Sequence, residues 1–100
     1  MPSLLRRLFA GKPTAEHLTV TVYTREQCCL CHKAIDLLKE RQKRYRFRIV
    51  EVDIDADPEL VAKHGEQIPV VAFDDKVRFR MMVNPALLDR LLLAEAAGGR

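Results

Sequence analysis

The chain has 100 residues, of which 48% are hydrophobic and 31% charged, and its formal net charge is +3 at pH 7. This length fits one domain, and so mild a positive charge does not require nucleic acid or a membrane surface as a partner. No apolar run approaches the roughly 18 residues of a membrane-spanning helix. The three cysteines fall within four positions, which excludes the disulfide framework of a secreted protein and favours a reducing compartment.

The first sixteen residues are expected to form an extension ahead of the domain. They hold apolar and basic residues and, before Glu16, no acidic residue, a composition that weakly resembles a mitochondrial transit peptide. The other interpretation is a short amphipathic or flexible segment. We therefore predict a cytoplasmic protein, with the mitochondrial matrix as the alternative location.

The domain is predicted to span residues 17–97 and to begin with a strand over 17–24. Leu18, Val20 and Val22 alternate with polar residues there, as in a half-buried strand. A short polar connection follows. A helix is then expected after Cys28, because its apolar residues recur at helical spacing: Leu30, Ala34, Leu37 and Leu38 on one face, with Lys33, Asp36, Lys39 and Glu40 facing away.

A largely apolar second strand is predicted over residues 46–55, as in a central parallel strand. Together with the preceding strand and helix it makes a βαβ unit. Asp57 and Pro58 are typical of a helix start, and Gly65 of its end.

A third strand is predicted over residues 67–73, a turn over 74–76 and a hairpin strand over 77–81. Asn84 then caps a last helix whose predicted buried stripe is Leu87, Leu88, Leu91 and Leu92. Residues 98–100 are expected to form a short tail.

Chemistry is expected at Cys28-Cys29-Leu30-Cys31, between the first strand and the helix. Unpaired N–H groups and the positive end of the helix dipole favour a thiolate at such a position. Cys28 is therefore predicted to be the nucleophile and Cys31 its resolving partner, cycling between dithiol and disulfide. Cys29 is interpreted as a spare thiol. The arrangement of strand, C-x-x-C and helix reads as a thioredoxin-like redox motif.

The stretch from Val22 to Cys31 resembles the glutaredoxin segment that ends in C-P-Y-C, and Ile68-Pro69-Val70-Val71 falls where that family has its cis-proline. The chain most resembles small glutaredoxin-like proteins whose motif is C-x-L-C. This resemblance covers about residues 17–96. It implies an α/β thioredoxin-like fold of the glutaredoxin type, a four-stranded mixed sheet flanked by helices in the order β-α-β-α-β-β-α.

The same resemblance implies substrate-binding roles outside the cysteine motif. Pro69 is expected to be cis and to present the backbone of Ile68 to a substrate chain, the alternative being an ordinary trans proline in a loop. Arg25 stands where glutaredoxins have a lysine that meets a glutathione carboxylate. Arg25 could instead stabilise the thiolate by its charge or be a solvated loop residue.

We expect a thiol–disulfide oxidoreductase or electron donor that acts on protein disulfides through Cys28 and Cys31. Its partners would be those substrates and a reductant, glutathione or a reductase, with no bound cofactor, metal, nucleic acid or membrane, and the chain a monomer. Met81–Pro85 replaces the Gly-Gly-x-Asp that grips glutathione in the family, which predicts weak glutathione binding. Two alternatives stay open, a module holding an iron–sulfur cluster or metal shared between chains, and a redox-silent adaptor.

Overall fold

The computed structural model describes residues 12–98. The predictions for the chain before residue 12 and for residues 99–100 lie outside the described residues. The elements are β1 (Thr19–Thr24), α2 (Cys29–Tyr45), β2 (Arg48–Asp53), a 3₁₀ turn η1 (Ile54–Ala56), α3 (Pro58–His64), β3 (Val70–Phe73), β4 (Lys76–Arg80) and α4 (Pro85–Gly98). Apart from the short turn η1, this is the predicted order β-α-β-α-β-β-α, which is confirmed.

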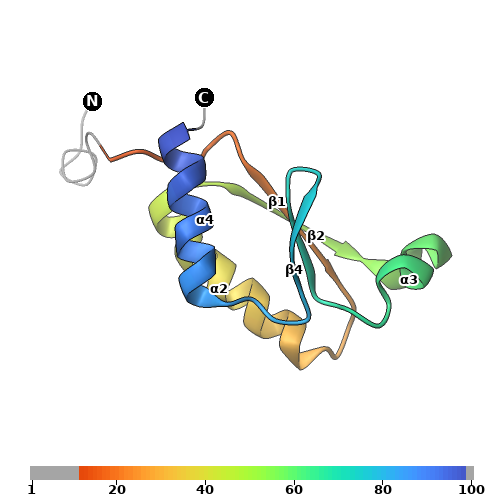
Figure 1. Cartoon of the computed structure of the whole chain (residues 1–100). Coiled ribbons are helices and arrows are strands. Elements are labelled where there is room, and N and C mark those ends of the chain that lie inside the picture. The colour runs from red at the N-terminus through yellow and green to blue at the C-terminus, as the bar shows by residue number, and fades with distance from the viewer. Residues whose placement is uncertain (1–11, 99–100) are drawn as a thin grey trace, which may run out of the picture.

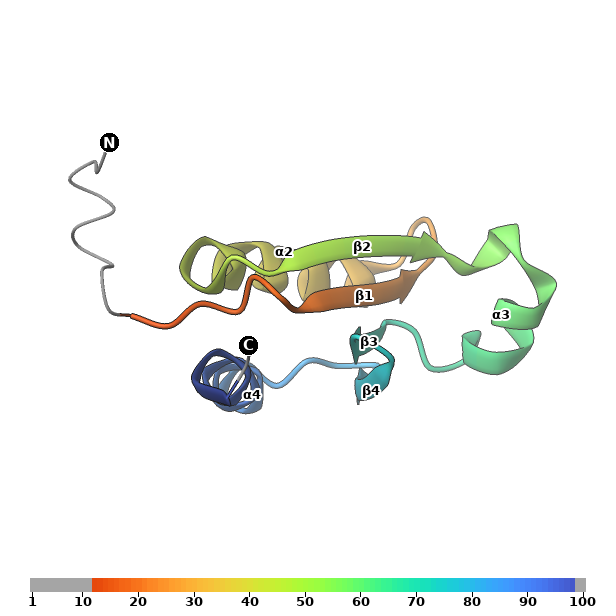
Figure 2. The ribbon, with the colours of Figure 1, turned by 90° about the horizontal axis from the view of Figure 1, so that it is seen from above.

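The four strands form one mixed sheet in the order β2-β1-β3-β4. Strand β1 pairs parallel to β2 and antiparallel to β3, and β3 pairs antiparallel to β4. Figure 1 and Figure 2 show α3 at the opposite end of the sheet from α4. Helices α2 and α4 contact each other, whereas α3 packs chiefly against η1.

Apolar side chains from β1, β3, α2 and α4 make a single core. Leu18, Val20 and Val22 are fully buried, as their alternation predicts. All four residues of β3 are buried. Ala15 also belongs to the core, and its N–H donates to the Tyr45 carbonyl at 2.7 Å, so packing begins just before residue 17.

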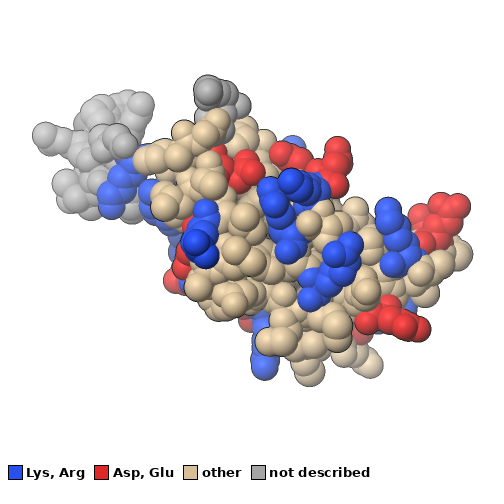
Figure 3. Space-filling view, viewed as in Figure 1, with Lys and Arg blue, Asp and Glu red and all other residues tan. Residues whose placement is uncertain are grey.

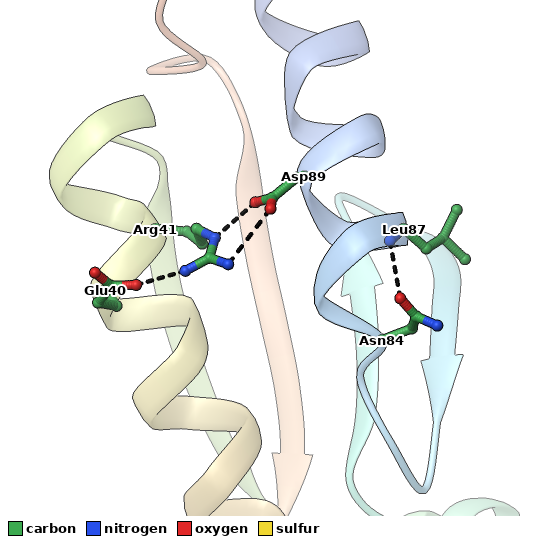
Figure 4. Close-up of polar contacts among 5 residues, drawn as sticks. All are labelled: Glu40, Arg41, Asn84, Leu87 and Asp89. Atoms are coloured by element: carbon green, nitrogen blue, oxygen red, sulfur yellow. Dashed lines mark hydrogen bonds and ion pairs between the residues drawn. The ribbon is translucent and has the colours of Figure 1, made fainter.

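Helix ends follow the predicted capping residues. The carboxylate of Asp57 accepts from the Glu59 N–H at 2.9 Å and Pro58 is the first residue of α3. The side-chain oxygen of Asn84 accepts from the Leu87 N–H at 3.0 Å at the start of α4 (Figure 4). These bonds satisfy N–H groups that have no partner inside the helix.

Helices α2 and α4 are joined by an ion pair. Arg41 donates to Asp89 through Nε at 2.6 Å and through Nη2 at 3.4 Å, and its Nη1 contacts Glu40 at 2.5 Å (Figure 4). Two further arginines near the end of α2 have partners as well. Arg44 lies over the Tyr45 ring at 4.5 Å, and Arg46 pairs with Glu16 at 3.3 Å.

The structure corrects the predicted second strand and the turn after the third. Strand β2 is an edge strand and not a central one. Its residues are less buried than their apolar character predicted. Ile54, predicted inside that strand, begins η1 and is fully buried there. Lys76, predicted in a turn, is the first residue of β4.

Two leucines predicted on buried helix faces are exposed. Leu87 of α4 is 41% exposed, whereas Leu88 and Leu92 of the same stripe are fully buried. Leu30 of α2 is 39% exposed because it lies in the first turn of the helix, at the edge of the core. Periodicity identifies a helix face but not how far the rest of the protein covers that face.

Candidate functional site

The site begins with Cys28, the N-cap residue of α2. Its backbone is extended, at φ −105° and ψ 106°, and its sulfur accepts from the Cys31 N–H at 3.2 Å. The first turn of α2 contains no acidic residue, and the positive end of the helix dipole favours negative charge there. These are the surroundings that stabilise a thiolate at this position.

Cys28 and Cys31 are paired as a disulfide, with their Cα atoms 5.2 Å apart. The two sulfurs differ in accessibility, since Cys28 is partly exposed and Cys31 is fully buried. Cys29 is a free, exposed thiol. The motif therefore offers one accessible and one shielded sulfur on a single helical turn.

Arg25 is engaged by an acidic partner. Its Nε and Nη2 donate to Asp55 at 3.2 Å and 2.6 Å in a two-pronged pair. This hydrogen bond lowers the pKa of Asp55 below its ordinary value, so the carboxylate stays charged and holds the guanidinium fork. Arg25 is thus not a free loop cation. No local signal in the sequence predicts this pairing, because the partners lie 30 residues apart.

Ile68–Pro69 is a cis peptide bond, as expected. Strand register places it near the cysteine motif, because Val70 pairs with Tyr23 and the motif follows the end of β1. The Gln67 and Pro69 carbonyls both accept from the Met81 N–H, at 3.0 Å and 2.9 Å. Within residues 12–98 the backbone of Ile68 makes no hydrogen bond.

Two hollows flank the cysteine motif. A cleft of about 250 Å³ lies between the loop after β1 and β2, and it is lined by Thr24, Arg25, Glu26, His32, Ile35, Glu51 and Asp53. A groove of about 210 Å³ lies between the start of α2 and the loop from β4 to α4. Leu30, the residue directly before Cys31, forms part of the groove's wall, so the groove lies next to the cysteine motif.

Two residues beside the site have left-handed backbone that the sequence did not predict. Gln27, directly before Cys28, has φ 61°, and Met81 has φ 72°. Glutamine and methionine rarely adopt this conformation, and such strain concentrates at functional sites. Sequence reasoning had no means to find them, since neither residue type signals a positive φ.

A four-stranded mixed sheet with a cysteine pair at a helix start and a cis-proline before the third strand defines a thioredoxin-like protein. The chain belongs to the family described as Glutaredoxin-like domain (DUF836), whose model matches residues 19–93. Its predicted family and fold are confirmed. No match is found among curated proteins.

Solved structures agree with this fold. A protein from X. campestris is 25% identical, with a TM-score of 0.64 over 75% of this chain and 96% of that one. Protein Ne2328 from Nitrosomonas europaea is 24% identical, with a TM-score of 0.60 over 81% and 93% of the two chains. A thioredoxin variant from Halobacterium salinarum is 12% identical, with a TM-score of 0.59 over 79% and 74%.

Two further observations concern the described part of the chain only. No helix within residues 12–98 is long and apolar enough to cross a membrane. Nor do these residues bring three or more His, Cys, Asp or Glu side chains together in a way that could hold a metal ion.

Proposed function

We propose that the protein is a thiol–disulfide oxidoreductase that reduces protein disulfides through Cys28 and Cys31. The observation that carries this proposal is the unequal exposure of the two sulfurs at the start of α2. An incoming disulfide reaches Cys28 first, and Cys31 lies one turn further along the helix, behind it.

The reaction proceeds by two exchanges. The Cys28 thiolate attacks one sulfur of the substrate disulfide, forming a mixed disulfide and releasing the other substrate sulfur as a thiolate. The Cys31 thiolate then attacks the Cys28 sulfur and releases the second substrate thiolate. Two electrons pass to the substrate, the two protons of the protein dithiol end on the substrate thiols, and Cys28–Cys31 becomes the disulfide. A thiol or dithiol reductant restores the starting state by the reverse steps.

The loop before β3 supports the binding half of this proposal. The unpaired N–H and C=O of Ile68 offer an extended substrate segment two hydrogen-bonding groups. Because Pro69 has no N–H to donate, the hydrogen bonds to a substrate segment form at the neighbouring Ile68. Arg25, paired with Asp55, lines the cleft on the β2 side of the motif.

Trapping experiments test the assignment of roles. The Cys31→Ser variant should accumulate a mixed disulfide with a protein substrate, and the Cys28→Ser variant should not. Cys29→Ser is the matched control, since it removes the neighbouring exposed thiol and should leave reduction of a protein disulfide unchanged. Accumulation by Cys28→Ser, or loss of reduction in Cys29→Ser, would show that the roles are assigned wrongly.

A further inference from the structure

The groove between α2 and the β4–α4 loop is almost entirely apolar. Its only charged lining residue is Lys33, and the others are Leu30, Ala34, Leu37, Met81, Met82, Val83 and Pro85. Met81 is 50% exposed and Met82 is 71% exposed. Folding leaves these two side chains exposed, so they do not contribute to the hydrophobic core.

Met81 is held at the groove's wall against its backbone preference. Its φ of 72° favours glycine, and its N–H is fixed by the carbonyls of Gln67 and Pro69. A non-glycine residue in this conformation costs on the order of 1 kcal/mol or more. Methionine at this place supplies a flexible, polarisable side chain that adapts to an apolar partner.

Basic residues lie next to this apolar surface. Arg80, the last residue of β4, directly precedes Met81, and Lys76 and Arg78 lie earlier on that strand. Figure 3 shows Lys and Arg side chains gathered over β4, with an uncharged area beside them where the β4–α4 loop runs. Arg78 adds a buried Nε that has no hydrogen-bond partner among the described residues. The surface thus combines an apolar hollow with an adjoining positive field.

We infer that this groove selects the substrate: it takes an apolar side chain next to the substrate's disulfide, with acidic residues of the same segment lying towards β4. Leu30 on the groove's wall places the apolar side chain next to the cysteine motif, and Arg80 at the end of β4 complements the acidic flank. Glutathione carries no apolar side chain to fill the hollow. This inference rests on the proposed function and names its substrate class.

Single-turnover reduction by the pre-reduced protein tests the preference without any added reductant. The probes are four peptide disulfides with leucine or serine beside the cysteine and glutamate or lysine two positions beyond. We expect the leucine–glutamate peptide to react about tenfold faster than the serine–glutamate peptide, the size of discrimination that an apolar pocket gives. The advantage of glutamate over lysine should shrink in high salt.

Two variants connect the preference to the groove. Met82→Ser should lose most of the leucine preference, whereas Leu93→Ser, which removes an exposed apolar residue of α4 outside the groove, should keep it. The wild-type protein and Leu93→Ser should reduce hydroxyethyl disulfide, a small uncharged probe, at the same rate. Normal rates on that probe without a leucine preference overturn this inference alone. Failure to reduce any disulfide overturns the proposed function as well.

A binding measurement keeps the inference testable apart from the chemistry. Leucine–glutamate peptide with serine in place of cysteine is titrated into the oxidised protein, and the methyl signals of Met81 and Met82 are followed. We expect both to shift and to saturate. Equal shifts with glutathione at the same concentrations, or shifts that follow protein concentration without peptide, would assign the groove to glutathione or to a second copy of the chain and overturn the inference.

Discussion

Separating Arg41 from Asp89 should loosen the attachment of α4 to α2. Two hydrogen bonds join these side chains, and Arg41 is 25% exposed and Asp89 49% exposed at the side chain. Exposed ion pairs contribute about 0.2–1 kcal/mol. Because this pair is two-pronged and partly shielded, we expect a coupling free energy at the upper end, about 1 kcal/mol, or roughly 4 °C in Tm for a domain of this size.

The assay is a double-mutant cycle by urea unfolding, with Asp89→Asn, Arg41→Met and the double variant. Arg46 and Glu16 give the matched control, since their single 3.3 Å contact joins side chains that are 65% and 63% exposed. Their coupling should be near zero. A coupling for Arg41 and Asp89 no larger than the control's, or one that does not decrease in 1 M salt, would refute the reasoning.

Three further predictions concern the core, a buried histidine and the free thiol. Leu88→Ala should cost about 2–5 kcal/mol of unfolding free energy, and Leu87→Ala, next to it but exposed, under about 0.5 kcal/mol; equal losses would contradict the assigned burial. Burial, helped by Lys63 and Arg80, lowers the pKa of His64, so stability should fall as pH drops below about 6.5, and His64→Phe should flatten that decline in urea titrations at each pH. The oxidised protein should bind one equivalent of a maleimide, and Cys29→Ser none; labelling of Cys28 or Cys31 without reductant would contradict their pairing.

Local signals in the sequence predicted most of the fold. Alternation in β1, the caps at Asp57 and Asn84, and the helical spacing after Cys28 all act within a few residues, and the structure bears them out. The edge position of β2 could not be predicted in this way. It depends on which strands pair, which the apolar content of one strand does not determine.

In the candidate site too, local features could be predicted from the sequence and features that depend on distant contacts could not. The cysteine pair lies within four consecutive residues, so its spacing and its place before a helix were sufficient to predict it. The Arg25–Asp55 pair and the wall at Met81 depend on contacts between distant segments and on backbone geometry unusual for the residue type. Such features become visible only when the chain is folded.

The pairing of β1 with β3 brings together two parts of the chain that contribute different parts of the candidate site. Cys28 and Cys31 precede β2, whereas Pro69, Met81 and Met82 follow α3. Under the proposed function, substitutions in the loop after β4 would alter which substrates are accepted and leave the thiol chemistry intact. The same division gives a protein engineer a compact segment, residues 81–84, in which loop exchange leaves the cysteine pair untouched.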